Sequence, residues 1–221
     1  MHNKLKELTL EEKASLMSGA NFWNTKPIER LNIPGIMLTD GPHGVRKQGG
    51  KADHLGLHKS LEATCYPTAS TLANSWDETL LNKVGEMLGA EAAHHGVSVL
   101  LGPGINIKRN PLCGRNFEYF SEDPYLTGKL ASSMIHGIQS NGISACVKHF
   151  AVNSQEHIRM SVDEIVDKRA LHELYLEAFT YNFGYLDELE ERLFVIDSLE
   201  DLENYIGFIN ENNDYYGDRH Y

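Results

Sequence analysis

Four side chains with complementary hydrogen-bonding properties are the best candidates for chemistry in this sequence: Asp40, Arg115, Lys148 and His149. They supply donors and acceptors of both charge signs, and none of them is a thiol or hydroxyl nucleophile. A polyol requires such a mixture, because each of its hydroxyls both donates and accepts a hydrogen bond. Bidentate contacts from a carboxylate or a guanidinium fix neighbouring hydroxyls in position. These residue types therefore predict a site for a polyhydroxylated ligand such as a sugar.

Aromatic side chains near the candidate residues could stack on the apolar face of a sugar ring, and they are Phe117, Tyr119 and Trp23. Phosphate binding is disfavoured, since the sequence has no glycine-rich loop followed by Lys-Ser or Lys-Thr. Each candidate taken alone also has a structural interpretation. Asp40 could form a turn, and Lys148 could extend its amino group into solvent. His149 could be hydrogen-bonded without any functional role. The charged loop 106–121 also fits a solvated surface loop with an internal ion pair.

Three short apolar runs predict the buried strands that position these residues. They lie at Ile36–Leu38, Val97–Leu101 and Ile143–Val147, and the third reads as a fully buried parallel strand. Polar residues follow each run: Asp40 the first, a Gly102 turn with the charged loop 106–121 the second, and Lys148-His149 the third. The carboxyl ends of parallel strands meet at one edge of a sheet. This convergence favours a functional site over the separate structural interpretations.

Helical patterns alternate with the strands. Capping boxes at Thr9–Glu12 and Ser75–Glu78 predict two helix starts, the second helix running to about His95 and ending at Gly96. Asp123-Pro124 predicts a third helix that closes at Asn141-Gly142, and a last helix is expected from about Asp167 to Phe179. The order predicts an α/β fold with parallel strands and right-handed crossovers.

Composition excludes several classes of protein. With 221 residues the chain can bury one good core and form at most two small domains. The sequence contains no run of eighteen apolar residues, which a membrane span would require. The amino terminus also lacks an apolar signal core, so a cytoplasmic protein is expected. Three widely spaced cysteines indicate neither a disulfide framework nor a zinc site. Gly56 weakens a helix that would pair His54 with His58, so neither a metal nor a cofactor is expected.

The net charge of −11 is unevenly distributed. Residues 181–221 contain eleven acidic residues against two arginines, whereas residues 1–180 carry a net charge of only −2. This change predicts a main domain over residues 1–180 and a separate acidic segment over 181–221. Neither part has the basic patch that nucleic-acid binding requires.

Four segments together resemble the amino-terminal barrel domain of glycoside hydrolase family 3, of the β-glucosidase type. They are residues 39–46 (Thr-Asp-Gly-Pro-His-Gly-Val-Arg), 100–109 (Leu-Leu-Gly-Pro-Gly-Ile-Asn-Ile-Lys-Arg), 113–124 (Cys-Gly-Arg-Asn-Phe-Glu-Tyr-Phe-Ser-Glu-Asp-Pro) and 147–150 (Val-Lys-His-Phe). They follow the family's order, and the resemblance covers about residues 5–180.

The resemblance implies a (β/α)8 TIM-barrel-like fold and retaining hydrolysis of β-linked glucosides or related sugars in carbohydrate metabolism. Matched position by position, it also implies that five residues bind the sugar in the subsite beside the bond that is cut. These residues are Asp40, Arg46, Arg115, Lys148 and His149.

The sequence departs from the family where the catalytic carboxyl groups are expected. A retaining glycosidase needs a carboxylate nucleophile and a carboxyl acid/base about 5 Å apart. In this family the nucleophile is the Asp of a Ser-Asp-Trp type motif on a later strand, and the acid/base follows it. No Ser-Asp-Trp occurs in these 221 residues. We therefore expect an incomplete barrel, with about three strands, that lacks both catalytic residues and is a truncated form of the enzyme.

The acidic segment does not resemble the family's continuation. Residues 192–197 fit a short strand and residues 198–209 an amphipathic helix, so a small β-α unit, the end of an unrelated protein and a stretch without fixed structure all remain open. Three functional hypotheses follow. The chain is a family 3 hydrolase reduced to its sugar-binding part, a non-catalytic sugar-binding protein, or an assembly subunit. In the last case a complementary chain or self-association covers the open barrel edge.

Overall fold

The computed structural model describes residues 6–49, 59–159 and 161–183. These residues divide into two compact units: a smaller one with residues 6–19 and 26–35, and a larger one with 20–25 and the described residues from 36 onward. The histidine pair in the loop before residue 59, and the strand and helix expected in the acidic segment, lie outside the described residues. The predicted domain boundary near residue 180 stays a prediction.

The smaller unit is organised by helix α2 (Leu10–Leu16) and the single turn η1 (Glu29–Leu31). Thr9 caps α2 as predicted: its Oγ1 accepts from the Glu12 amide at 3.2 Å, and its own amide donates to Glu12 Oε2 at 2.8 Å. Glu12 also pairs with Arg30 of η1 at 2.7 Å. Leu8, Ile28 and Leu31 form the small apolar core of this unit.

A three-stranded parallel sheet lies at the centre of the larger unit. Its strands are β1 (Leu38–Asp40), β2 (Val99–Leu101) and β3 (Ser144–Ala145), in the order β1-β2-β3. Asp40 is in register with Leu101, and Leu100 is in register with both Thr39 and Ala145. Leu100 is fully buried because it occupies the central strand. The predicted alternation of parallel strands and helices is confirmed.

Two strand predictions need correction. The first strand begins later than its apolar run, since Ile36 is 39% exposed and the buried residue of β1 is Thr39. Ile36 exchanges hydrogen bonds with Thr25 instead, at 3.0 Å through its carbonyl and 2.9 Å through its amide. The third strand is two residues long, with Ser144 exposed and Ala145 half-buried, so it is not a fully buried strand. The reason is that β3 is an edge strand of the described sheet.

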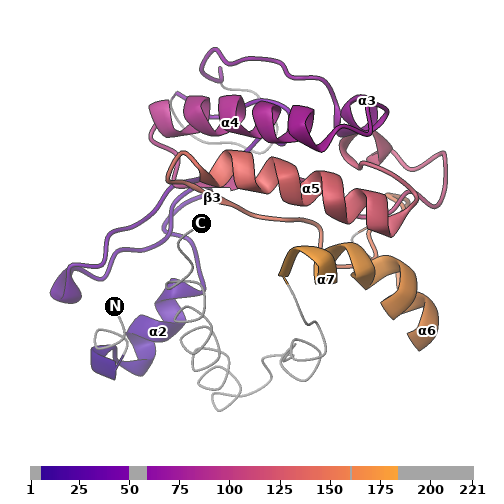
Figure 1. Ribbon diagram of the computed structural model, residues 1–221. Helices are drawn as coiled ribbons and strands as arrows, with labels where there is room; N and C mark the ends of the chain where they lie inside the picture. Colours follow the sequence, from indigo (N-terminus) through magenta and orange to yellow (C-terminus); the bar gives the residue numbers. More distant parts are fainter. Residues whose placement is uncertain (1–5, 50–58, 160, 184–221) are drawn as a thin grey trace. The chain divides into compact units, whose positions relative to one another are not determined.

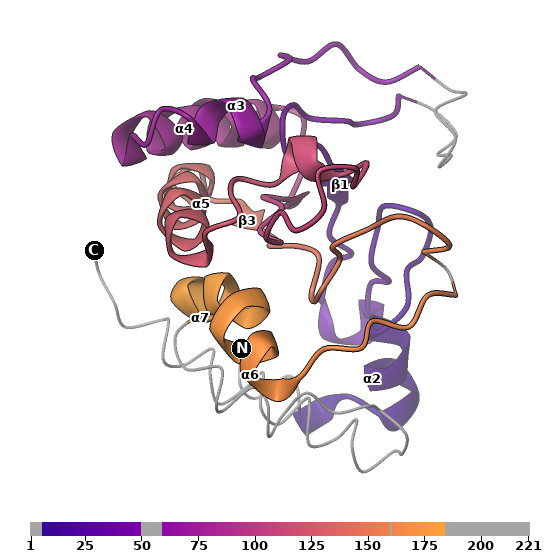
Figure 2. The same ribbon diagram turned by 90° about the vertical axis from the view of Figure 1, so that its right-hand side faces the viewer.

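Helices pack along one side of this sheet. Helix α5 lies between α4 and α7 in both views (Figures 1 and 2). Leu81 and Leu88 of α4 and Leu130 and Met134 of α5 are at most 1% exposed, so these two helices form the main core. The remaining bounds are α3 (Ala69–Ala73), α4 (Glu78–His94), η2 (Asn116–Glu118), α5 (Pro124–Gln139), α6 (Lys168–Ala170), the π-helical turn η3 (Leu171–Leu176) and α7 (Glu177–Phe183).

Local sequence signals account for most helix ends. Helix α5 begins at Pro124 as predicted, and Asp123 caps it, because its Oδ1 accepts from the Leu126 amide at 2.9 Å. Gly96, at φ +69°, follows the end of α4, also as predicted. The capping box predicted at Ser75 is wrong. Asp77 caps α4, and the Ser75 hydroxyl donates at 2.6 Å to the Leu72 carbonyl in α3, a helix that was not predicted.

In the part of the chain that the structure describes, no helix combines the length and apolarity that crossing a bilayer requires.

Candidate functional site

An ion pair joins the end of β1 to the segment that follows β3. Lys148 Nζ donates to Asp40 Oδ1 at 2.7 Å, although the two residues are 108 positions apart in the chain. The backbone beyond β2 holds Lys148 in place: the Lys148 amide donates to the Pro103 carbonyl at 3.1 Å, and its carbonyl accepts from the Ile105 amide at 2.7 Å. The parallel topology therefore brings these two predicted site residues into direct contact.

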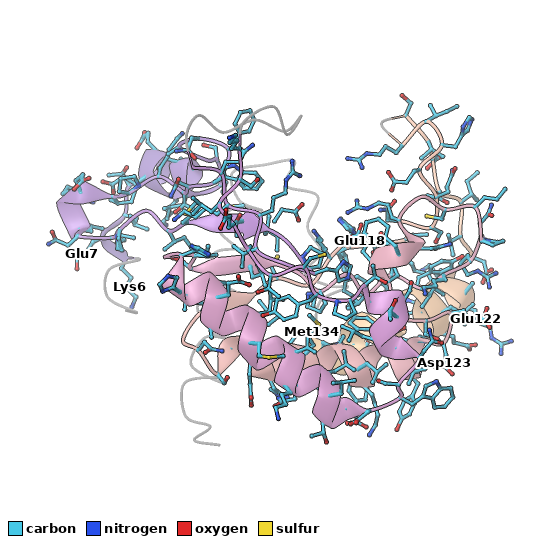
Figure 3. All side chains as sticks on the ribbon, turned by 90° about the horizontal axis from the view of Figure 1, so that it is seen from above. Lys6, Glu7, Glu118, Glu122, Asp123 and Met134 are labelled. Atoms are coloured by element: carbon cyan, nitrogen blue, oxygen red, sulfur yellow. The ribbon has the colours of Figure 1, made fainter. Side chains whose placement is uncertain are left out.

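Glu118 is a site residue that the sequence-based prediction missed. Its Oε1 accepts from Arg115 Nε, and its Oε2 lies 4.0 Å from Lys148 Nζ. Only 5% of its side chain is exposed, so the carboxylate is buried among cations. It is the last residue of the short helix η2 and is labelled in Figure 3. The available signal was its three-residue spacing from Arg115 inside the charged loop.

His149 is held through both its backbone and its ring. The Asn106 side chain accepts from the His149 amide at 2.6 Å and donates to the His149 carbonyl at 2.8 Å. The ring Nδ1 lies 3.2 Å from the Tyr119 hydroxyl. Burial, together with the positive charges of Arg115 and Lys148, lowers the pKa of His149 to about 4. The imidazole is therefore neutral at pH 7.

Burial and Lys148 act in opposite directions on Asp40. Burial alone would raise the pKa of this carboxyl group, but the hydrogen bond and the charge of Lys148 hold it below the ordinary value of 3.8. Asp40 is therefore an ionised carboxylate. Its side chain is still 35% exposed, so it remains accessible to a ligand.

A hollow of about 410 Å³ opens beside this network. It has the size of a small-molecule site. Arg46 enters its wall because its amide donates to the Asp40 carbonyl at 2.9 Å, while its carbonyl accepts from the Thr39 hydroxyl at 2.8 Å. Asp40, Arg46 and Arg115 thus face one space, and Lys148 is bonded to its wall. The lining residues are Asp40, Gly41, Pro42, His43, Gly44, Arg46, Arg115, Phe117 and Glu118.

A tight turn with two essential glycines shapes this wall. Gly41 and Gly44 have φ values of +129° and +148°. A Cβ at Gly41 would lie 1.9 Å from the Gly44 carbonyl oxygen, and one at Gly44 would lie 2.3 Å from the Thr64 carbonyl oxygen. Only glycine fits at either position. His43, which the prediction did not single out, is fixed within the turn because its Nε2 accepts from the Ala69 amide at 2.8 Å.

The aromatic candidates have different surroundings. Phe117 lines the hollow and is 53% exposed, so its ring is available for stacking. Tyr119 is fully buried, with its hydroxyl bonded to His149 and Asn153, and the prediction that its ring stacks on a ligand is therefore wrong. Trp23 Nε1 donates to Gln48 Oε1 at 3.3 Å.

The two acidic residues of the hollow are both engaged by cations, Asp40 by Lys148 and Glu118 by Arg115. A cation bonded to a carboxylate lowers its basicity and therefore its strength as a nucleophile. Among the described residues no group of three His, Cys, Asp or Glu side chains could hold a metal ion. The arrangement is suited to binding and orienting hydroxyl groups.

Comparison with known proteins places this chain in a family. Residues 11–182 match the model of the glycosyl hydrolase family 3 N terminal domain. Thermostable beta-glucosidase B of Acetivibrio thermocellus is 61% identical over 175 residues, which are 79% of this chain and 23% of that protein. An exo-alpha-(1->6)-L-arabinopyranosidase of Bifidobacterium breve is 51% identical over 178 residues, which are 80% of this chain and 24% of that protein. The chain thus spans about a quarter of the length of these relatives.

Solved structures agree in fold. Beta-glucosidase 3B of Thermotoga neapolitana in complex with glucose superposes with a TM-score of 0.74 at 43% identity, covering 82% of this chain and 27% of that one. The beta-glucosidase of Kluyveromyces marxianus in complex with glucose gives a TM-score of 0.75 at 43% identity, covering 82% of this chain and 21% of that one.

Proposed function

Because the chain belongs to glycosyl hydrolase family 3 and carries that family's N-terminal domain, we propose that its described residues bind a β-glucoside for hydrolysis. The three strands and their helices are the first part of the family's TIM-barrel-type domain. In this proposal the hollow holds the sugar unit next to the bond that is cut. Most of these relatives are named as beta-glucosidases, which supports a glucoside substrate.

The observation that carries the proposal is the charge network along the hollow. The ionised Asp40 can accept hydrogen bonds from two neighbouring hydroxyls, while Arg46 and Arg115 donate to others. Phe117 offers an apolar surface for the carbon face of the ring. Lys148 Nζ donates to Asp40 Oδ1 at 2.7 Å and so fixes the position of the carboxylate. Together these groups match the mixed polar and apolar character of a pyranose.

Cleavage is a separate requirement. Retaining hydrolysis needs two carboxyl groups about 5 Å apart, one as the nucleophile and one as the acid/base. Asp40 and Glu118 are both committed to ion pairs, and the 221 residues contain no Ser-Asp-Trp motif. We propose that these residues bind and orient the sugar, and that the groups that break the bond are not among them.

Glucose-dependent thermal stabilisation of the 221-residue chain tests the binding proposal. We expect glucose to raise Tm for the wild type and for Asp163→Ala, a control at an exposed position outside the hollow. The rise should disappear in Asp40→Ala. An equal rise in Asp40→Ala, or no rise in the folded wild type, would contradict the proposal.

Hydrolysis of an aryl β-D-glucoside tests the catalytic part. We expect no turnover above background from the purified 221-residue chain. Turnover that Asp40→Ala abolishes would show that another carboxylate completes the site.

The pairing of both carboxylates also favours a second candidate, a sugar-binding or assembly subunit that works with a complementary chain. Such a subunit would supply the binding groups, and its partner the catalytic ones. Size-exclusion chromatography with the remaining, carboxyl-terminal part of a family 3 enzyme separates the two candidates. A defined complex that hydrolyses the aryl glucoside supports the assembly subunit, whereas separate elution with no hydrolysis excludes it.

A further inference from the structure

A buried phenol connects His149 to the segment that follows it. The Tyr119 hydroxyl lies 3.2 Å from His149 Nδ1 and accepts from Asn153 Nδ2 at 3.0 Å. Tyr119 itself is 0% exposed. Water therefore does not compete for these hydrogen bonds, and the protein groups alone determine where each proton lies.

The orientation of the Asn153 amide follows from its neighbour. Asn153 Nδ2 lies 3.1 Å from Glu156 Oε1, and Glu156 is in turn held by Arg159 at 3.0 Å. A carboxylate paired with an arginine only accepts hydrogen bonds, so the amide atom that faces it must be the nitrogen. The two hydrogens of Asn153 Nδ2 then go one to Glu156 and one to the Tyr119 oxygen.

The Tyr119 hydroxyl has one remaining acceptor for its proton. Its oxygen already accepts from Asn153, and among the described residues His149 is its other hydrogen-bond partner. If His149 carried a proton on Nδ1, the buried hydroxyl would have no acceptor for its own, which is unfavourable. Burial raises the pKa of Tyr119 to about 12, so the hydroxyl stays protonated at neutral pH.

We infer that Tyr119, oriented by Asn153, holds His149 in the tautomer that carries its proton on Nε2. Tyr119 and Asn153 are positioning residues, because they act on the ligand through His149. The bonds from Asn106 to the His149 backbone fix the ring's point of attachment. Nδ1 is occupied, so Nε2–H is the hydrogen bond that the ring can offer. Its role as a donor to a sugar hydroxyl rests on the proposed function, whereas the tautomer itself does not.

Nitrogen NMR of the full chain labelled with ¹⁵N-histidine tests the tautomer without any ligand. The His149 signals are identified by their loss in His149→Gln. At neutral pH we expect the wild type to show one protonated Nε2 and one unprotonated Nδ1. Tyr119→Phe should move both shifts toward the average of the two tautomers. Asn153→Ala should move them less in the same direction, because the hydroxyl remains but is no longer oriented.

Tyr125→Phe is the matched control, since it removes a hydroxyl from a tyrosine that is 58% exposed on α5. It should leave the His149 shifts unchanged. A wild-type His149 protonated on Nδ1 would overturn the inference, as would shifts that stay at their wild-type values in folded Tyr119→Phe. If Tyr119→Phe does not fold, unchanged shifts in Asn153→Ala overturn it.

A glucose titration of the same samples separates this inference from the proposed function. We expect the affinity for glucose to fall about fivefold in Tyr119→Phe, as for the loss of one oriented neutral hydrogen bond. A wild type that does not bind glucose but shows the tautomer change would contradict the proposed function and leave the inference standing. Normal glucose binding by the wild type, together with unchanged His149 shifts in both variants, would contradict the inference and leave the proposed function standing.

Discussion

At the level of single residues, Asp40 gains stability from an ion pair that more than offsets its burial. Lys148 lowers the pKa of this carboxyl group below its ordinary value of 3.8 despite the opposing effect of burial. The unfolded chain therefore takes up a proton at Asp40 at a higher pH than the folded protein does. The contribution of Asp40 to the free energy of unfolding is fully present above its ordinary pKa and is lost as the pH falls through its folded pKa.

We expect Asp40→Asn to be less stable than the wild type above about pH 4, with a difference that shrinks as the pH falls below the ordinary value of 3.8. Urea denaturation at several pH values measures this difference in the free energy of unfolding. Asp163→Asn, at an exposed position outside the hollow, is the matched control. A difference for Asp40→Asn that is the same at all pH values would rule out this account.

His149 should also make stability fall as the pH falls, but over a higher pH range than Asp40. Burial, with Arg115 and Lys148, lowers its pKa to about 4, although Asp40 and Glu156 oppose this. An unfolded histidine takes up a proton near its ordinary value of 6.5, so the folded state loses stability as the pH falls from 6.5 toward 4.

His149→Gln should therefore show a shallower loss of stability than the wild type between about pH 6.5 and pH 4. Burial also lowers the pKa of His43, so part of the slope should remain. The same urea series measures the effect. Identical slopes for the variant and the wild type would mean that His149 is not buried in a neutral form.

At the level of elements, α4 and α5 touch backbone to backbone through glycines. A Cβ at Gly137 would lie 2.1 Å from the Asn82 carbonyl oxygen, and one at Gly85 would lie 2.2 Å from the Met134 carbonyl oxygen. Backbone atoms on both sides cannot move without shifting a helix. This contact is what lets α5 lie close to α4 while its other side meets α7 (Figure 1).

We expect Gly137→Ala to lower the free energy of unfolding by roughly 1–3 kcal/mol through overpacking, although alanine favours an isolated helix by about 1 kcal/mol. His136→Ala, at the neighbouring exposed position on α5, should change it by less than about 0.5 kcal/mol. Chemical denaturation of both variants measures these effects. Stabilisation by Gly137→Ala would show that the helices are not in such close contact.

At the level of the whole molecule, the larger unit contains the complete candidate site. The hollow, the Asp40–Lys148 pair and the Tyr119–His149 connection all lie between residues 39 and 159. Most of the negative charge lies elsewhere, because residues 181–221 carry −9 of the net −11. Sugar binding should therefore not depend on the acidic segment.

A chain that ends after residue 183 should keep the glucose-dependent rise in Tm and lose it again with Asp40→Ala. This result would support the domain boundary predicted near residue 180. Thermal unfolding with and without glucose measures it. A shortened chain that folds but no longer responds to glucose would show that the acidic segment contributes to the site.

Features that depend on neighbouring residues were predictable from the sequence. Thr9 caps its helix through a hydrogen bond that spans three residues, so its spacing from Glu12 was sufficient to predict the cap, and the Asp123-Pro124 pair was sufficient to predict the start of α5. The order of strands and helices followed from apolar periodicity. The four motifs together were specific enough to identify the family, and with it the five residues expected to bind the sugar.

Contacts between distant parts of the chain could not be predicted in this way, because they depend on how the chain folds. The pairing of Asp40 with Lys148, the burial of Glu118 among cations and the position of Tyr119 behind His149 each depend on how the strands and loops pack. The Ser75 hydroxyl bonds to the end of helix α3, and Asp77 caps α4 in its place. The difference lies in how far apart along the chain the interacting residues are. A cap or a turn forms within a few residues, whereas a side chain's burial and charge partners depend on segments that the fold brings together from far along the chain.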